Sequence, residues 1–251
     1  FPNPIASLQN QSLSDQKDAD YPDLQPAYRV VTLTSLDGSG YLRGDWANIT
    51  SETGKAAYSA DGSFMFNRHD DQFEQVMAYY WATEAQKYIQ SLGFGTVFRP
   101  INRESQDIRI NQYGIDNSYS WDKHDVLRFG KGGVDDAEDA EVILHEYGHA
   151  MMDSQMTPFG YGTSVEAASI GEGFADYWAA TVSSVIAPTP DPACVADWDS
   201  VSYTTAIPHC LRRVDSTLTY PTDLNGRVHH DGQIWSSALW AIRNKLGNSK
   251  A

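Results

Sequence analysis

The chain has 251 residues, of which 41% are hydrophobic and 20% charged, a composition typical of a globular protein with a substantial core. The 33 acidic and 18 basic residues give a formal net charge of −15 at pH 7, which repels phosphate backbones and anionic membrane surfaces. Since no run of 18 apolar residues is present either, we expect no nucleic-acid partner, no membrane partner and no membrane-spanning segment.

The N-terminal part of the chain predicts an arm followed by strands. Residues 1–27 are polar and contain four prolines, which favours an extended N-terminal arm over a packed element. Residues 28–36 alternate between apolar and polar side chains as a strand does, and the glycine-containing stretch 37–49 predicts a turn that leads into another strand.

A helix and two short strands are expected next. Apolar side chains recur at helical spacing from Asp71 to Leu92, and Gly93 provides a stop signal. The best strand candidates after this helix are residues 107–114 and 126–132.

The second half of the chain predicts helices. Helical patterns cover residues 141–153, 165–186 and 232–247, and an acidic run at 135–141 suits the N-terminus of the first of them. Because strands come first and helices later, the order of elements indicates an α+β fold.

The two cysteines, Cys194 and Cys210, flank the loop between the last two predicted helices. They either form one bridge, which would stabilise the folded chain by about 3 kcal/mol, or remain free thiols. A bridge and the glycosylation sequons at Asn10 and Asn48 are compatible with export, so we expect a secreted, extracellular protein. The chain starts at Phe1 without a signal peptide, and we therefore expect a processed or trimmed fragment.

The stretch EVILHEYGHAMMD at 141–153 carries two histidines and a glutamate within an apolar helical pattern. His145 and His149 lie four residues apart, so both can direct a ring nitrogen at one ion from the same face of the helix. Glu146 lies about 100° further round the helix, which places it beside a water on that ion rather than on the ion. An ordinary core helix with a few satisfied polar groups is the alternative, because such short patterns also occur by chance.

A second segment, GEGFADYWA at 171–179, contains a candidate third ligand. Catalytic zinc keeps three protein ligands and a water, and Glu172 would complete a set of two histidines and one glutamate. Asp176, four residues later on the same helical face, could accept the other ring N–H of a ligand histidine and so fix its orientation. A solvated acidic face is the alternative, although the apolar neighbours in this stretch indicate a buried helix.

The combination of HEYGH and GEGFAD resembles the gluzincin metallopeptidases, and among them most closely the fungalysin family, with thermolysin more distant. The resemblance implies a zinc ion bound by His145, His149 and Glu172. It further implies that Glu146 is the general base that activates water, and that Asp176 is the partner of His145.

The resemblance also implies an architecture and a reaction. The expected fold has two lobes, a β-rich N-terminal lobe over 28–150 that ends in the HEYGH helix and a mainly helical C-terminal lobe over 151–251 that is truncated or unusually small. The expected reaction is hydrolysis of peptide bonds within polypeptides by a secreted, monomeric zinc endopeptidase. An apolar residue is expected on the prime side of the cut.

The resemblance extends to residues that would contact the substrate. His229 matches a histidine that stabilises the tetrahedral intermediate, and Arg212 matches an arginine that grips the substrate carbonyl; their neighbours His230 and Arg213 are less favoured. A further match is the edge strand that pairs with the substrate backbone in thermolysin, at Asn117, Ser118 and Tyr119.

The chain departs from thermolysin at several positions. Gly171 stands where thermolysin has an asparagine that orients the second histidine, and Tyr161 does not keep the spacing of the catalytic tyrosine. Thermolysin-like enzymes also often bind calcium near the zinc helix, and an acidic cluster of this chain either does the same or is a solvated group that caps the helix. Its members are Asp135, Asp136, Glu138, Asp139 and Glu141.

Two other functions stay open at this point. The chain could be a non-catalytic binding module with a structural zinc, in which case His229 or His69 would close the fourth position of the ion. It could also be a pseudoprotease that has lost its activity. An aminopeptidase is less favoured, because no obvious motif supplies an acidic anchor for a free amine.

Overall fold

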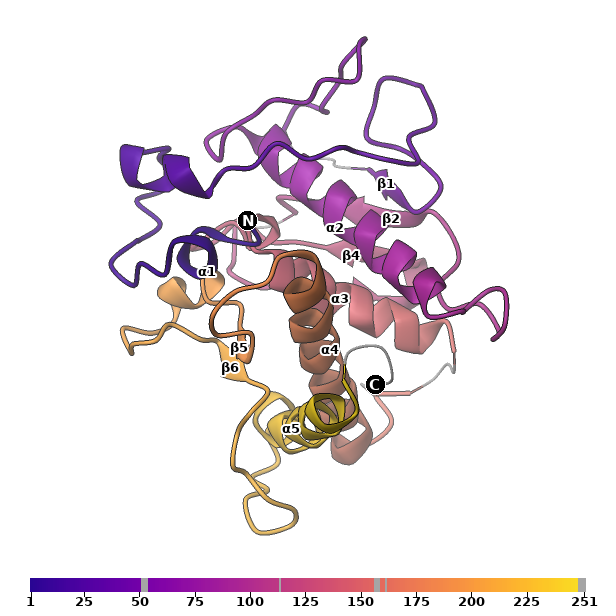
Figure 1. Cartoon of the computed structure of the whole chain (residues 1–251), viewed down its shortest axis with the longest axis vertical. Helices are drawn as coiled ribbons and strands as arrows, with labels where there is room; N and C mark the ends of the chain where they lie inside the picture. The colour runs from indigo at the N-terminus through magenta and orange to yellow at the C-terminus, as the bar shows by residue number, and fades with distance from the viewer. Residues whose placement is uncertain (51–53, 113, 156–158, 161, 248–251) are drawn as a thin grey trace.

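A short mixed sheet and four long helices make up the body of the described chain (Figure 1). The computed structural model describes residues 1–50, 54–112, 114–155, 159–160 and 162–247. The fold is α+β, as the order of predicted elements indicates. The strands are β1 (Ala47–Ile49), β2 (Gln106–Arg109), β3 (Tyr119–Trp121), β4 (Val126–Arg128), β5 (Cys194–Val195) and β6 (Arg212–Arg213). The long helices are α2 (Asp71–Ser91), α3 (Ala140–Asp153), α4 (Val165–Ile186) and α5 (Val228–Leu246).

The main sheet has the strand order β1-β2-β4-β3. The first three of these strands are parallel, and β3 pairs antiparallel with β4, which leaves β3 at one edge. Ile49 lies opposite Ile108, and Ile108 opposite Leu127, and all three side chains are buried. α2 packs against β1 and crosses in front of the sheet in the view of Figure 1, while α3 contacts β3 and β4.

The strands predicted at 107–114 and 126–132 are confirmed in shortened form as β2 and β4, and the end of the stretch 37–49 forms β1. Asn111, two residues beyond β2, has a positive φ, which takes the chain out of the extended conformation and explains why this strand ends before residue 114. β4 begins at the predicted residue, directly after Asp125, which also has a positive φ.

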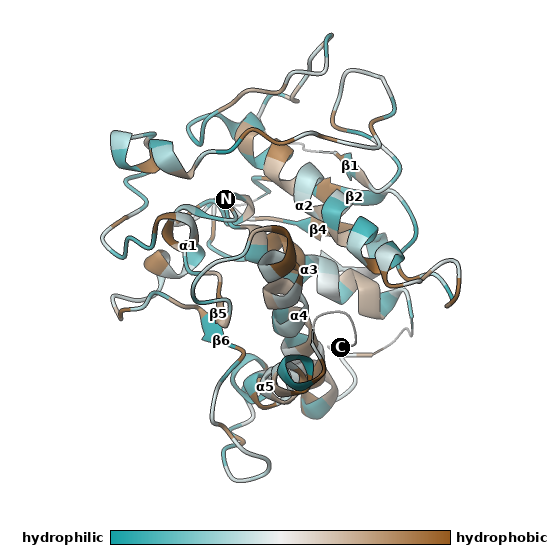
Figure 2. Cartoon of the chain, in the orientation of Figure 1, coloured by the Kyte–Doolittle hydropathy of each residue, from teal (hydrophilic) through white to brown (hydrophobic). Residues whose placement is uncertain are grey.

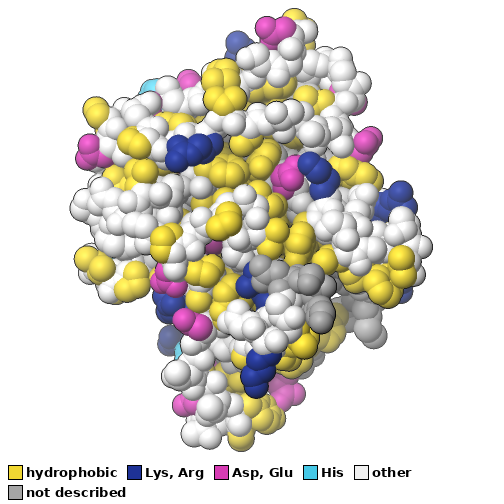
Figure 3. Space-filling model, viewed as in Figure 1, with side chains coloured by type: hydrophobic (Ala, Val, Ile, Leu, Met, Phe, Trp, Pro, Cys, Tyr) yellow, Lys and Arg dark blue, Asp and Glu magenta, His cyan; other side chains and the backbone are white. Residues whose placement is uncertain are grey.

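The strand predicted for 28–36 is wrong. This segment crosses the end of α2 without joining the sheet, and Tyr79 of α2 donates a hydrogen bond to the backbone oxygen of Thr34. Because the segment has no partner strand beyond a single bridge at Leu36, its apolar side chains are only partly covered, and Val30 is 81% exposed. Figure 3 shows apolar side chains in several groups on this face of the molecule.

The helices predicted at 71–92, 141–153 and 165–186 are confirmed. Asp139 caps α3 by accepting a hydrogen bond from the backbone N–H of Glu141, and Ser164 caps α4 in the same way. α3 lies between α2 and α4, and Figure 2 shows strongly apolar turns on α4 in the middle of the molecule.

The last helix begins four residues before the start expected from its apolar pattern, at Val228 rather than 232. Asp231, in its first turn, accepts hydrogen bonds from the backbone N–H groups of Asn225 and Gly226. These bonds fold the preceding loop back onto the helix start, so the polar first turn becomes helical.

Residues 1–27 are packed onto the body of the protein, contrary to the extended arm expected from their polarity. They contain α1 (Pro4–Leu8) and a 3-10 helix, η1 (Pro22–Ala27). Ile5 and Leu24 are fully buried in a small cluster with Trp198. A few apolar side chains placed on one face are therefore enough to dock a mostly polar segment.

Cys194 and Cys210 form a disulfide, so the bridged alternative is confirmed. The bridge lies in the loop between α4 and α5, where β5 pairs with β6 and brings Arg212 towards α4. None of the described helices combines the length and the apolar character that crossing a membrane requires.

Candidate metal centre

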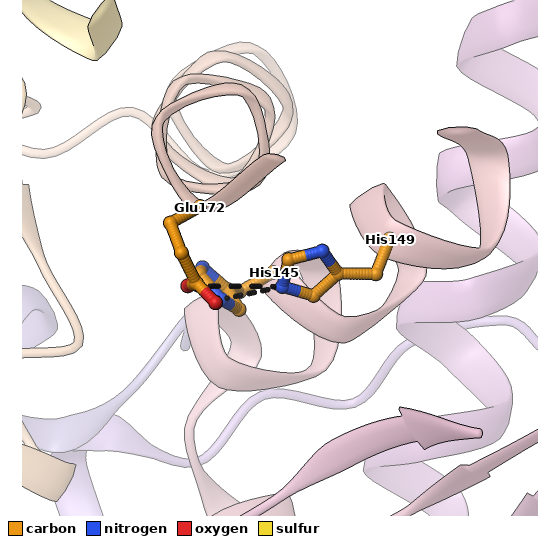
Figure 4. Close-up of side chains that lie close together, drawn as sticks. All are labelled: His145, His149 and Glu172. Atoms are coloured by element: carbon orange, nitrogen blue, oxygen red, sulfur yellow. Dashed lines mark hydrogen bonds and ion pairs between the residues drawn. The ribbon is translucent and has the colours of Figure 1, made fainter. Parts of the chain in front are cut away.

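Two neighbouring helices bring the predicted zinc ligands together. His145 and His149 lie on α3, and Glu172 lies on α4, which packs beside it (Figure 4). A Cβ added at Gly148 would lie 3.0 Å from the Cα of Ala175, so this glycine allows the two helix backbones to approach closely. The local sequence of HEYGH thus supplies both the ligands and the close helix contact.

The three side chains point to one focus (Figure 4). His149 Nε2 lies 3.2 Å from His145 Nε2, and Glu172 Oε2 lies 3.2 Å from His145 Nε2 and 3.8 Å from His149 Nε2. One donor atom of each residue lies within 4.8 Å of the other two. Two imidazole nitrogens and a carboxylate oxygen are a donor set of catalytic zinc sites, so these residues fit zinc.

Asp176 orients the first histidine. His145 Nδ1 lies 2.8 Å from Asp176 Oδ1, and an ionised carboxylate can only accept a hydrogen bond. Nδ1 therefore carries a hydrogen, and Nε2 is the ring nitrogen that faces the other ligands and would bind an ion in place of a proton. Burial alone would raise the pKa of Asp176. The positive charge of Arg212 and the hydrogen bond from His145 outweigh burial and hold this pKa far below its usual range.

Burial and neighbouring charges shift the pKa of each of the three ligands. Burial lowers the pKa of His145, but its hydrogen bonds to Asp176 and Glu172 outweigh burial and raise the pKa to about 10. Burial lowers the pKa of His149 to about 4, which keeps this ring neutral, as a metal ligand must be. Burial raises the pKa of Glu172, but the hydrogen bond to His145 and the nearby histidines lower it to about 2.

Glu146 lies beside this cluster with a free acceptor atom. Its side chain is buried, and Oε2 has no hydrogen-bond partner among the described residues. Burial raises the pKa of Glu146 to about 7, although nearby His145 favours the charged form. A carboxylate that titrates near neutral pH is well matched to general-base catalysis.

Arg212 holds Asp176 rather than projecting freely into solvent. Its Nε donates to Asp176 Oδ2 at 2.7 Å, and its Nη2 donates to Asp176 Oδ1 at 2.8 Å. A two-point contact of this kind fixes the carboxylate as well as the arginine. Arg213 instead pairs with Asp191 and Asp215, so Arg212 is the one of the two that contacts the partner of His145.

No fourth protein ligand joins the cluster in the part of the chain that the structure describes. His229 Nε2 lies 3.3 Å from Glu172 Oε2, but His229 does not belong to the set of mutually close donor atoms, and its side chain is 54% exposed. His69 is exposed outside the site, and His230 pairs with Asp231. The arrangement is therefore the open one that catalytic zinc sites share.

A model of the fungalysin metallopeptidase family matches residues 38–250. The chain belongs to this family. It is therefore a zinc metallopeptidase, a hydrolase that acts on peptide bonds, and the resemblance inferred from HEYGH and GEGFAD is confirmed. No curated protein matches the chain.

A cleft of about 630 Å³ opens in front of the metal centre of this fungalysin-family chain. The structure brings the predicted residues Asn117, Ser118 and Tyr119 to its wall, together with His229 and Glu146. Sequence reasoning missed several other lining residues, because nothing in their local pattern marks them; they include Ser120, Lys123, Phe159, Gly160 and Gly162. Tyr161 lies outside the described residues.

The acidic cluster before α3 is buried, so its interpretation as a solvated group is wrong. Each of its five carboxylates is at most 4% exposed. Glu138 pairs with buried Arg68, Glu141 accepts the backbone N–H of Ala196, and only Asp139 caps the helix. The sequence did not predict this burial, because no local pattern shows that Arg68 pairs with Glu138, seventy residues later in the chain.

Proposed function

We propose that this fungalysin-family protein is a secreted endopeptidase in which Glu146 is the general base. The observation that carries the proposal is the buried Glu146 carboxylate, which has a free oxygen beside three converging zinc ligands and lines the same open cleft. The disulfide between Cys194 and Cys210 supports secretion, because such bridges persist in oxidising compartments. We further propose that the chain acts as a monomer.

The chain's own residues perform most of the proton chemistry. Bound zinc would act as a Lewis acid and lower the pKa of water from 15.7 to about 7. Glu146 would accept the proton of the attacking water and deliver it to the leaving amine. His229, whose Nε2 lies 3.3 Å from Glu172 Oε2, would donate a hydrogen bond to the oxygen that becomes negative, while Asp176 holds the His145 ring in its orientation.

The substrate would lie extended along β3. This strand lies at the edge of the sheet, where an extended peptide could add as a further strand. Asn117, Ser118 and Tyr119 line the cleft at the start of the strand, which favours cleavage within a polypeptide over trimming of its end. Val142 and Leu211 line part of a side pocket next to Glu146, which would take the side chain beside the cut bond; Asp136 and Asp199 line another part of it.

Two segments of the chain would form the two walls of this cleft. We propose residues 28–150, which end in the HEYGH helix, as the side that holds the substrate backbone. Residues 151–251 form the other side with Glu172 and His229. Arg212 would act chiefly by holding Asp176, and its contact with a substrate carbonyl is a further part of the proposal.

The proposal is tested by incubating the zinc-loaded chain with casein, with and without a zinc chelator, and identifying the fragments by mass spectrometry. We expect internal fragments that disappear with the chelator and return with added zinc. Intact casein beside a fully zinc-loaded chain would favour a pseudoprotease or a binding module. Stepwise loss of terminal residues would show an exopeptidase instead.

A further inference from the structure

An apolar pocket of about 180 Å³ adjoins the zinc cleft at the C-terminal end of α3. Met152 and Phe159 line both the pocket and the cleft, so the two spaces are neighbours. The other described residues that line the pocket are Ile101, Met151, Gln155 and Phe174. Five of these six side chains are apolar. We call this space the α3-end pocket, and the mechanism described above gives it no role.

Hydrogen bonds to the end of α3 hold one wall of the α3-end pocket in place. This wall is the loop between α2 and β2. Arg99 Nε donates to Gln155 Oε1 at 2.8 Å, and Arg99 Nη2 donates to the backbone oxygen of Gln155 at 3.0 Å. The backbone N–H of Asn102 donates to Ser154 Oγ at 3.0 Å. Ile101 lies between these two contacts and packs against the main core, so its side chain is a fixed part of the wall.

We propose that the α3-end pocket binds an apolar side chain of the polypeptide substrate. This inference rests on the proposed endopeptidase function, because the shared wall of Met152 and Phe159 connects the pocket to the cleft of that enzyme. Apolar cavities of about 150 Å³ bind a benzene ring, so the pocket has room for a leucine or phenylalanine side chain. Methionine is flexible, and Met151 and Met152 would let the pocket adapt to both shapes.

The positions of the lining residues along α3 place the α3-end pocket and the side pocket next to Glu146 on opposite sides of the zinc ligands. Val142, in the side pocket, lies three residues before His145, and Met152 lies three residues after His149. Ten residues of α-helix span about 15 Å, a length that an extended peptide covers in about four residues. With the residue directly after the cut bond in the side pocket, the α3-end pocket takes a side chain about two to four positions before the cut.

The test uses the full, zinc-loaded chain and a set of peptides that share one cleavage site. The peptides carry glycine, leucine, phenylalanine or aspartate at one position at a time, up to four residues before the cut. We expect kcat/KM for leucine or phenylalanine to exceed that for glycine by at least about 10-fold at one of these positions. Ile101→Phe narrows the pocket and should remove most of this preference. Ile101→Ala widens it and should shift the preference from leucine towards phenylalanine.

Val97→Phe is the matched control, because Val97 lies in the same loop, is 78% exposed and is not among the residues that line the pocket. This variant should keep the preference of the parent. Cleavage at equal kcat/KM whatever the side chain would overturn the pocket while leaving the endopeptidase function in place. A preference unchanged in both Ile101 variants would place the contact elsewhere and overturn the pocket as well; Ile101→Ala alone decides this if Ile101→Phe does not fold. No cleavage of any peptide would contradict the proposed function itself, and this inference with it.

Discussion

The zinc centre and a second group of carboxylates, Asp116, Asp136 and Asp199, which we call the acidic junction, differ in how their charges are compensated. At the zinc centre, Glu172 and Asp176 face two histidines and Arg212, and both carboxyl groups have a lowered pKa. At the acidic junction, Asp136 faces other carboxylates, and burial raises its pKa to about 7. Burial is similar at both sites, so the partner decides the sign of the shift.

This difference explains why only the first site is suited to zinc. The two histidines give the first site neutral nitrogen donors, and Glu172 supplies an anionic ligand for a divalent ion. The acidic junction has no nitrogen donors among its three members. The predictions below separate the two sites by chemistry, metal content and pH.

The largest effect is expected from Glu146→Gln, which removes the base from the zinc centre without removing a ligand. Turnover should fall by at least about 10²-fold, because glutamine cannot accept the proton of water. Zinc content should stay unchanged, as measured by elemental analysis beside a peptide-cleavage assay. Glu166→Gln, an exposed change in the first turn of α4, is the control. Turnover like that of the parent would remove Glu146 from its assigned role.

Glu172→Ala should strip the zinc centre of its anionic ligand. We expect a loss of more than about 100-fold in zinc affinity, since even changes to residues that only orient ligands cost 10–100-fold. Zinc retention is measured against a chelator of known affinity. Glu166→Ala on the same helix should retain zinc as the parent does. Full occupancy of Glu172→Ala after mild chelation would mean that another side chain is the third ligand.

The metal centre was largely predictable from sequence, because its ligands lie in two continuous helices with a fixed pitch. Four-residue spacing places His145 and His149 on one face whatever the rest of the fold does. The apolar pattern around Glu172 was strong enough to fix α4 at both ends. What sequence could not give was the distance between α3 and α4, which depends on the contact at Gly148.

The acidic junction and the segment 28–36 were not predictable for the opposite reason. Asp116, Asp136 and Asp199 come from three loops or short 3-10 helices whose positions depend on tertiary contacts. The alternation over 28–36 is typical of a strand, but a strand also needs a partner strand. This segment instead lies against α2, where Tyr79 donates a hydrogen bond to the backbone oxygen of Thr34. Local periodicity therefore predicted elements well and the meeting of loops poorly.

Asp176→Asn tests whether the contact from Arg212 to the zinc centre matters for metal binding. The amide keeps the shape of the carboxylate, but it has one oxygen instead of two. It therefore cannot accept all the hydrogen bonds from His145 Nδ1 and Arg212. Zinc affinity is expected to fall by about 10–100-fold. Asp191→Asn, which breaks a surface pair with Arg213, should leave zinc affinity unchanged. A drop in Tm of the metal-free protein without any change in zinc affinity would indicate a purely structural role.

The smallest effect is expected in the pH dependence of stability, where the two sites should respond in opposite directions. Because the pKa of Asp136 rises from its ordinary value of 3.8 to about 7, the folded chain without calcium holds a proton that the unfolded chain releases. Its contribution to stability is present below pH 3.8 and is lost as pH rises towards about 7. The pKa of Glu172 is lowered from 4.5 to about 2, so its contribution is lost only as pH falls below about 4.5.

Asp136→Asn isolates the first of these contributions. With calcium chelated and Glu146→Gln in the background, urea unfolding should show the variant gaining stability relative to the parent between about pH 4 and pH 7. A difference that does not change with pH would mean that Asp136 is already ionised, and the contrast between the two sites would then be wrong.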